Sequence, residues 1–463
     1  MEAVGLALRG SGFLLGRHAI ISAVGFVVSL VLAWLLSPGD FGIFAVTLPP
    51  VTAAALLAEL GLPAALIRYA GGNLRGIASR IWRFQALAGA AGFGLIAAFS
   101  GAWCRYYGFP PGMERILLVH SLVLFVLPLR CVGVALLEKE LRYGRIAALE
   151  TAEFVFSQCV VVGLAWGGGG AWALVAGAVV RAAVGALVAP AMAGWHPGKA
   201  AGWRVIRPML AFGVPLQANH FVNFARDAVV PLVVARVAGV ESAGIIRWAT
   251  SVANYPALVL LNAGRTFYPL YARMRGSGAK LGRAFEGTVS LAAWGMGLAS
   301  VPLFGLAEPL VRLAFPGKWL PAVPLFYLFV PINLAMALTV PATHMLNAMG
   351  RPGIRLAFAT AGGVLLWAGT VLTVSTYGTQ GYAVSNLALN GLELGMLAVV
   401  ARHLKGMRLP WRNLAAATAC AGGLLAVSAL LSPLEWPGLA AAGVAGTAAY
   451  LVLAANPFRK VWS

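Results

Sequence analysis

Long apolar runs follow one another along this chain, and short polar or glycine-rich segments separate them. Most runs reach the roughly 20 residues that an α-helix needs to cross a bilayer. The pattern therefore predicts about fourteen membrane-spanning helices, with little of the chain left outside the membrane. The predicted spans cover residues 13–36, 41–62, 84–103, 116–137, 147–166, 171–193, 209–236, 242–262, 287–306, 322–348, 354–376, 380–402, 414–431 and 436–455.

The seventh of these runs carries a concentrated polar stretch across its middle, from Gln217 to Asp227. At about 100° per residue, most of these side chains fall on roughly a third of the helix circumference, and only Gln217 lies off this arc. Charged side chains are costly at mid-membrane, so the arc must face other helices or a watery cavity rather than lipid. The residues on the arc are Asn219, His220, Asn223, Arg226 and Asp227.

The composition agrees with a polytopic membrane protein. The chain is 60% hydrophobic and 10% charged, with a mean hydropathy of +0.84, whereas soluble domains carry about 25% charged residues. The net charge of +20 does not indicate nucleic-acid binding, because the basic residues are scattered between spans. The four cysteines are isolated and fit neither a disulfide framework nor a metal site, so we predict no metal and no organic cofactor. They are Cys104, Cys131, Cys159 and Cys420.

The basic residues also predict an orientation. Lys and Arg concentrate in alternate loops, and positive charge holds a loop on the cytoplasmic side. Both termini are then expected to be cytoplasmic. The outer loops, such as residues 37–40 and 167–170, are short turns, and none is large enough to be a separate catalytic module.

An internal repeat divides the predicted helices into two halves. The motif Gly42-Ile-Phe44 is matched by Gly244-Ile-Ile246, and three further short motifs recur in the same order at similar offsets. Six spans per half give both halves one orientation, related by an axis along the membrane normal. We therefore predict an all-α protein with an N-terminal lobe, a C-terminal lobe and two extra C-terminal spans. Their predicted boundaries are 1–200, 201–405 and 406–463.

Several motifs resemble those of one transporter family. They are Leu35-Leu-Ser-Pro-Gly-Asp-Phe-Gly-Ile-Phe44, Ala58-Glu-Leu-Gly-Leu-Pro-Ala-Ala-Leu-Ile-Arg68, Asn219 with Arg226-Asp227, Ile246-Arg-Trp-Ala249 with Asn254-Tyr-Pro256, and Lys318-Trp-Leu-Pro-Ala-Val-Pro324. In order and spacing they resemble the Wzx-type polysaccharide (O-antigen) flippases of the multidrug/oligosaccharidyl-lipid/polysaccharide exporter superfamily. The family's usual Asp-Leu-Gly-Leu is Glu59-Leu-Gly-Leu62 here, which is a conservative departure.

The resemblance implies a transporter and no enzymatic activity. Its substrate would be an undecaprenyl-diphosphate-linked oligosaccharide, moved from the inner to the outer leaflet of the bacterial cytoplasmic membrane by alternating access. The expected partners are this lipid-linked substrate, membrane lipids and other polysaccharide-assembly proteins.

Such a substrate needs cations for its diphosphate and hydrogen-bonding side chains for its glycan. Arginine is suited to the diphosphate, because its guanidinium forms bidentate contacts and stays charged. The candidate cavity residues are Arg17, His18, Arg68, Arg181, Asn219, His220, Asn223, Arg226, Arg247, Asn254 and Arg265.

Structural roles remain open for several of these arginines. Arg17, Arg68 and Arg265 could serve topology or contact lipid headgroups. Arg226 could pair with Asp227 or Glu59. Arg181 and the embedded Arg130 could pair with Glu150 or Glu153 of the fifth span, and we favour this role for Arg130.

Intramembrane acids in transporters often carry ions. Glu59, Asp227 and Glu393 are therefore candidates for coupling transport to H⁺ or Na⁺.

The sequence leaves three other functions open. A drug or cation exporter of the same superfamily would have an acidic, aromatic-lined cavity. A membrane enzyme such as a polysaccharide polymerase or ligase would need a sizeable outer segment. A scaffold with a degenerate transporter fold would tolerate loss of Arg226.

Overall fold

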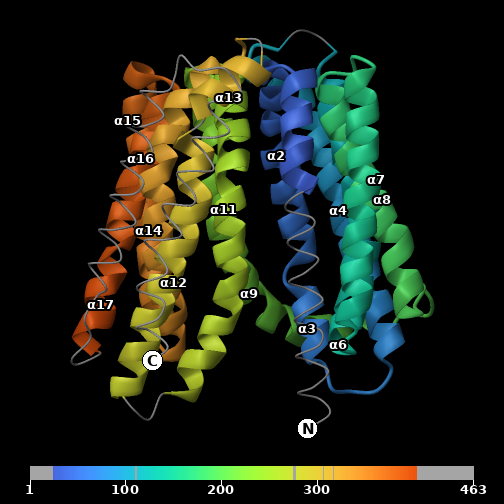
Figure 1. Ribbon diagram of the computed structural model, residues 1–463. Coiled ribbons are helices and arrows are strands. Elements are labelled where there is room, and N and C mark those ends of the chain that lie inside the picture. The colour runs from blue at the N-terminus through green and yellow to red at the C-terminus, as the bar shows by residue number, and fades with distance from the viewer. Residues whose placement is uncertain (1–23, 110–111, 275–277, 306, 316, 404–463) are drawn as a thin grey trace. The chain divides into compact units, whose positions relative to one another are not determined.

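The computed structural model describes residues 24–109, 112–274, 278–305, 307–315 and 317–403 (Figure 1). Regular structure in these ranges is entirely helical, which confirms the predicted all-α class. Eight of the described helices are long and apolar enough to cross a membrane. The protein is therefore a multi-pass membrane protein, and the number of about fourteen spans stays a prediction. The thirteenth and fourteenth predicted spans, and with them the whole predicted C-terminal segment 406–463, lie outside the described residues.

The chain divides between residues 244 and 245, so the described residues fall into two compact units, one before and one after this point. The first unit begins with a helix over residues 24–35, followed by α2 and α3, which together form the second predicted span. Its elements are α2 (Pro38–Glu59), α3 (Leu62–Arg68), α4 (Leu74–Tyr106), α5 (Glu114–Ser121), α6 (Val123–Lys139), α7 (Tyr143–Trp166), α8 (Ala171–Ala193), η1 (Trp203–Val205), α9 (Ile206–Asp227), η2 (Val230–Val234) and α10 (Ala235–Val237).

Local sequence explains how α2 starts. Ser37 caps the helix, and its hydroxyl accepts from the backbone N–H of Asp40, whose carboxylate in turn accepts from the backbone N–H of Ser37. This reciprocal arrangement satisfies two N–H groups that would otherwise lack partners at a helix start. Pro38 follows at the first helical position, where its missing N–H costs nothing.

The seventh predicted span is not one continuous α-helix. It consists of α9, a π-helical turn at η2 that contains Pro231, and the short α10. α9 packs on α2 and α3, and for this reason it falls in the first unit. The lobe boundary predicted at 200/201 comes from the sequence repeat and stays a prediction.

The segment that leads into α9 is fastened to the start of α4. Trp195 is buried in a cluster with Leu66, Ile77 and Val132. The backbone N–H of Ala201 donates to the carbonyl of Gly76 over 2.9 Å. These contacts fix where α9 begins relative to the rest of the first unit.

The two copies of the repeated Gly-Ile motif touch each other within the first unit. A Cβ on Gly42 would lie 1.9 Å from the carbonyl oxygen of Val240, and one on Gly244 would lie 1.8 Å from that of Pro38. Both pairs join residues of the two motif regions that are equivalent at the same sequence offset. Only glycine, which has no Cβ, leaves room for these contacts.

The second unit contains most of α11 and the helices that follow. Its elements are α11 (Val240–Arg273, which begins in the first unit), α12 (Gly278–Gly305), α13 (Ala307–Ala314), η3 (Leu320–Ala322), α14 (Val323–Ala348), α15 (Pro352–Tyr377), α16 (Thr379–Glu393) and α17 (Gly395–His403). α14 packs against α12, α15, α16 and α17 and is the central helix of this unit. Phe285, Met345 and Val400 belong to its main apolar cluster.

Candidate functional site

The polar arc predicted on the seventh span is carried by α9. His220, Asn223 and Asp227 are exposed, and Arg226 is half-buried. Gln217, the one polar residue off the arc, is buried, and its amide nitrogen donates to the carbonyl of Leu56 over 3.1 Å. The helix therefore turns the Gln217 side onto α2 and leaves the arc outside the packed interior of the first unit. Asn219 lies on the same helix.

Arg226 and Asp227 form an ion pair despite being sequence neighbours. The Arg226 Nε to Asp227 Oδ1 distance is 3.1 Å, and the two side chains are 33% and 70% exposed. One of the two partners considered from the sequence for Arg226 is thus present. An exposed pair of this kind contributes little stability, so it leaves the guanidinium able to exchange partners.

Arg68 is brought close to α9. It ends α3, is exposed, and its guanidinium lies 4.8 Å from the centroid of the Phe212 ring on α9. This cation–π contact places Arg68, a residue predicted to bind the diphosphate, against the helix that carries the polar arc.

The remaining candidates lie on other elements. Arg181 on α8 is exposed in the first unit, and Arg247 and Asn254 on α11 are exposed in the second. Arg265 also lies on α11, and Glu393 is half-buried at the end of α16. Arg17 and His18 lie outside the described residues.

Glu59 lies directly before a break in the second predicted span. Leu60 and Gly61 follow it in the left-handed conformation, with φ of 43° and 67°. α3 then restarts at Leu62. A Cβ on Gly61 would lie 2.2 Å from the carbonyl oxygen of Gly213 on α9. The break therefore depends on two glycines. Gly61 adopts the left-handed conformation, and Gly213 lets the backbone of α9 approach it closely.

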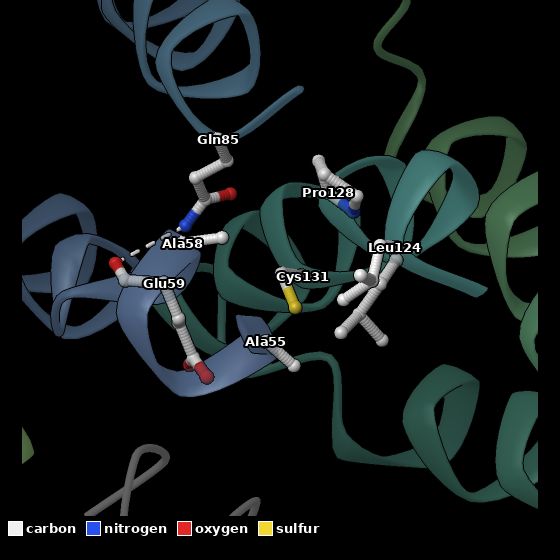
Figure 2. A pocket seen from close by; sticks show the side chains of 8 residues that line it. Ala55, Ala58, Glu59, Gln85, Leu124, Pro128 and Cys131 are labelled. Carbon is white, nitrogen blue, oxygen red and sulfur yellow. Dashed lines mark hydrogen bonds between the residues drawn. The ribbon is translucent and has the colours of Figure 1, made fainter. Parts of the chain in front are cut away.

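A small pocket adjoins this break, between α2, α4 and α6 (Figure 2). It offers about 10 Å³ to the centre of a water-sized sphere, which is the lower limit for one ordered water. The amide nitrogen of Gln85 on α4 donates to the carbonyl of Glu59 over 3.3 Å. The pocket is lined by Ala55, Ala58, Glu59, Gln85, Leu124, Leu127, Pro128 and Cys131.

A buried ion pair lies next to this region. Arg130 on α6 holds Glu153 on α7 with two contacts, Nε to Oε1 at 2.6 Å and Nη2 to Oε2 at 3.0 Å. This confirms the ion-pair role that we favoured for Arg130 from the sequence, and of the two candidate partners it is Glu153 that binds. A Cβ on Gly185 of α8 would lie 2.3 Å from the Glu153 carboxylate, so glycine provides the space that the pair occupies.

Sequence reasoning missed Gln85 and the break at residues 60–61. A glutamine at the start of the largely apolar third span was the signal for Gln85. Gly61-Leu-Pro63 was the signal for the break, since proline near the first helical position is typical of a helix start. In the described ranges, no group of three or more His, Cys, Asp or Glu residues could hold a metal ion.

Comparison with known proteins gives the family. The model of the family described as "Polysaccharide biosynthesis protein" matches residues 31–324. The chain belongs to this family. Two relatives are the lipopolysaccharide biosynthesis protein WzxC of Escherichia coli (strain K12) and the succinoglycan biosynthesis transport protein ExoT of Rhizobium meliloti (strain 1021). WzxC is 25% identical over 73% of this chain and 69% of its own length, and ExoT is 24% identical over 77% and 70%.

Solved structures show the same fold. The lipid II flippase MurJ in an inward closed conformation superimposes with a TM-score of 0.78 at 12% identity, covering 96% of this chain and 99% of its own. An inward-facing multidrug resistance MATE transporter gives 0.66 at 13% identity, covering 81% and 93%. These likenesses confirm the fold that the resemblance implied.

Proposed function

We propose that this family member flips an undecaprenyl-diphosphate-linked oligosaccharide from the inner to the outer leaflet of the bacterial cytoplasmic membrane. The observation that carries the proposal is the polysaccharide-biosynthesis family match over residues 31–324. Two relatives are named for lipopolysaccharide biosynthesis and for succinoglycan biosynthesis transport. The distribution of Lys and Arg over the loops supports an orientation with both termini in the cytoplasm. Other polysaccharide-assembly proteins deliver or receive the substrate.

The residues on α9 and α3 supply the chemistry for binding. Arg226 and Arg68 are cations for the diphosphate, and His220 and Asn223 are hydrogen-bonding groups for the glycan. Their accessibility supports this role, since these side chains are exposed or half-buried rather than locked in the core. The other members of the binding set remain Arg17, His18, Arg181, Asn219, Arg247, Asn254 and Arg265.

The charge of these side chains also separates flippase from drug exporter. The fold alone does not discriminate, because the solved relatives include both a lipid II flippase and multidrug transporters. From residue 154 to Arg226 the chain contains no Asp or Glu. An organic cation would find few counter-charges along α8 and α9, whereas a diphosphate would find several.

Genetics in the bacterium that encodes the chain tests the proposal. Deleting the gene should remove the surface polysaccharide and leave its lipid-linked precursor unexported, and the wild-type chain should restore export. Arg226→Gln should restore it poorly at normal protein abundance. Arg115→Gln, in an exposed residue at the start of α5, should restore it fully. Unchanged polysaccharide together with increased drug sensitivity in the deletion strain would contradict the proposal and indicate an exporter.

A further inference from the structure

The segment between α8 and α9 is held against α4 by hydrogen bonds to its backbone. The backbone N–H of Gly198 donates to Ser79 Oγ over 3.1 Å, and Arg83 Nη2 donates to the carbonyl of Gly198 over 3.0 Å. Arg80 Nε donates to the carbonyl of Ala201. Because these contacts repeat along the segment, it has one defined placement on the first turns of α4.

Trp203 is fixed in this segment but only half covered by protein. The guanidinium of Arg80 lies 4.6 Å from the centroid of the Trp203 ring, and the Phe84 ring meets it edge-on with 6.3 Å between centroids. The indole is nevertheless 51% exposed. A large ring that is held in place and left half exposed is typical of the membrane–water interface, where tryptophan is enriched.

The segment also lies at the depth of the lipid headgroups. It follows directly on α8, which is long and apolar enough to cross a membrane, and it packs on the first turns of α4, which is another such helix. A helix that crosses the hydrocarbon core brings the chain to the headgroup region at its end. The exposed face of the segment therefore meets lipid headgroups as well as water.

This exposed face is strongly basic. Lys199, Arg204 and Arg207 are all exposed. No ion pair joins any of the three to a carboxylate in the part of the chain that the structure describes. Asp and Glu are also absent from residues 60–113 and 154–226, which include the segment and the whole of α4. Anions of the membrane surface are the counter-charge available at this depth.

We propose that Lys199, Trp203, Arg204 and Arg207 form a binding surface for anionic phospholipid headgroups, which we call the linker patch. The three cations bind headgroup phosphates, and the indole inserts beside them. Each cation near an anionic membrane surface strengthens binding about fivefold. A soluble polyanion would gain nothing from the exposed indole, so the patch fits a lipid surface best. Bound lipid fastens the start of α9 to the membrane surface, and this role does not depend on the proposed flippase function.

Quenching of tryptophan fluorescence by brominated lipids tests the linker patch in liposomes that contain the purified full chain. Anionic dibromo-phosphatidylglycerol and zwitterionic dibromo-phosphatidylcholine, with bromine near the headgroup end of the acyl chains, are compared over the same range of mole fraction. The difference between the wild type and Trp203→Phe isolates the signal of Trp203. Half-maximal quenching of this signal should need at least about fivefold less phosphatidylglycerol than phosphatidylcholine.

Neutralising the three cations should remove this preference. The combined variant Lys199→Gln, Arg204→Gln and Arg207→Gln is expected to be quenched equally by both lipids. A matched control removes three exposed cations from the second unit and should keep the preference. Its substitutions are Arg351→Gln, Arg355→Gln and Arg402→Gln. Each triple variant is compared with the same variant carrying Trp203→Phe.

The proposal is overturned if both lipids quench the wild-type signal equally, or if both triple variants lose the preference alike, since net charge would then explain it. Should the first triple variant fail to fold, salt decides with the wild type. Sodium chloride at about 0.5 M should abolish a preference that rests on exposed charges, and a preference unchanged by salt overturns the proposal. Loss of the preference in dilute inorganic phosphate, but not in sodium chloride of equal ionic strength, would indicate a phosphate site and would also overturn it.

Discussion

Removing Arg130 should destabilise the protein more than removing its partner Glu153. The Glu153 side chain is 0% exposed, whereas that of Arg130 is 26% exposed. Without Arg130, a fully buried carboxyl group loses both of its charge-assisted hydrogen bonds. Breaking a buried pair in this way costs about 3–5 kcal/mol. Without Glu153, the long Arg130 side chain can turn its guanidinium toward its exposed side. We therefore expect the free energy of unfolding to fall by about 1–3 kcal/mol.

A double variant separates the loss of one charge from the loss of both. Arg130→Met with Glu153→Leu removes both charges and replaces them with apolar side chains of similar size. Such replacements are often neutral, so the double variant should be more stable than Arg130→Met alone. An exposed ion pair serves as the control. Arg142 Nε lies 2.7 Å from Glu140 Oε2, and the two side chains are 42% and 41% exposed. Arg142→Met should cost at most about 1 kcal/mol.

The assay is thermal unfolding of the purified full chain in detergent, followed by tryptophan fluorescence at one fixed scan rate. A fixed rate matters because such transitions are often irreversible. The expected order of unfolding temperature is wild type, then the double variant and Glu153→Leu, and Arg130→Met lowest. Equal losses for Arg130→Met and Arg142→Met would refute the reasoning, because burial would then make no difference.

Three glycine substitutions test the close contacts of the first unit. Gly185→Ala should lower the unfolding temperature, because its Cβ would lie 2.3 Å from the buried carboxylate of the ion pair. Gly61→Ala should abolish accumulation of folded protein, since it combines a φ of 67° with a contact of 2.2 Å to the Gly213 carbonyl. Gly42→Ala should destabilise through a backbone contact of 1.9 Å. Gly94→Ala, where no atom lies within 4 Å, should be neutral or slightly stabilising; thermal unfolding and membrane yield check all four.

Hydropathy predicted the described helices well, because crossing a bilayer requires long apolar segments whatever their neighbours are. The ion pair of Arg130 could also be predicted, since a charge inside a span needs a partner and the next span offers one. The break after Glu59 was missed although Gly61-Leu-Pro63 is a local signal for a new helix start, and its close approach to Gly213, far along the chain, could not be predicted from local sequence. The buried position of Gln85 was missed for the same reason: periodicity gives the face of a helix but not what that face meets.

The central claim is tested most directly by flipping in proteoliposomes that contain only the purified chain and a synthetic undecaprenyl-diphosphate-linked oligosaccharide. The substrate is introduced on one leaflet, and its appearance on the other is followed with a membrane-impermeant sugar-modifying enzyme. We expect rapid appearance with the wild-type chain and slow appearance with Arg226→Gln. Equal rates for the wild-type chain and protein-free liposomes, at every membrane orientation and pH tested, would contradict it.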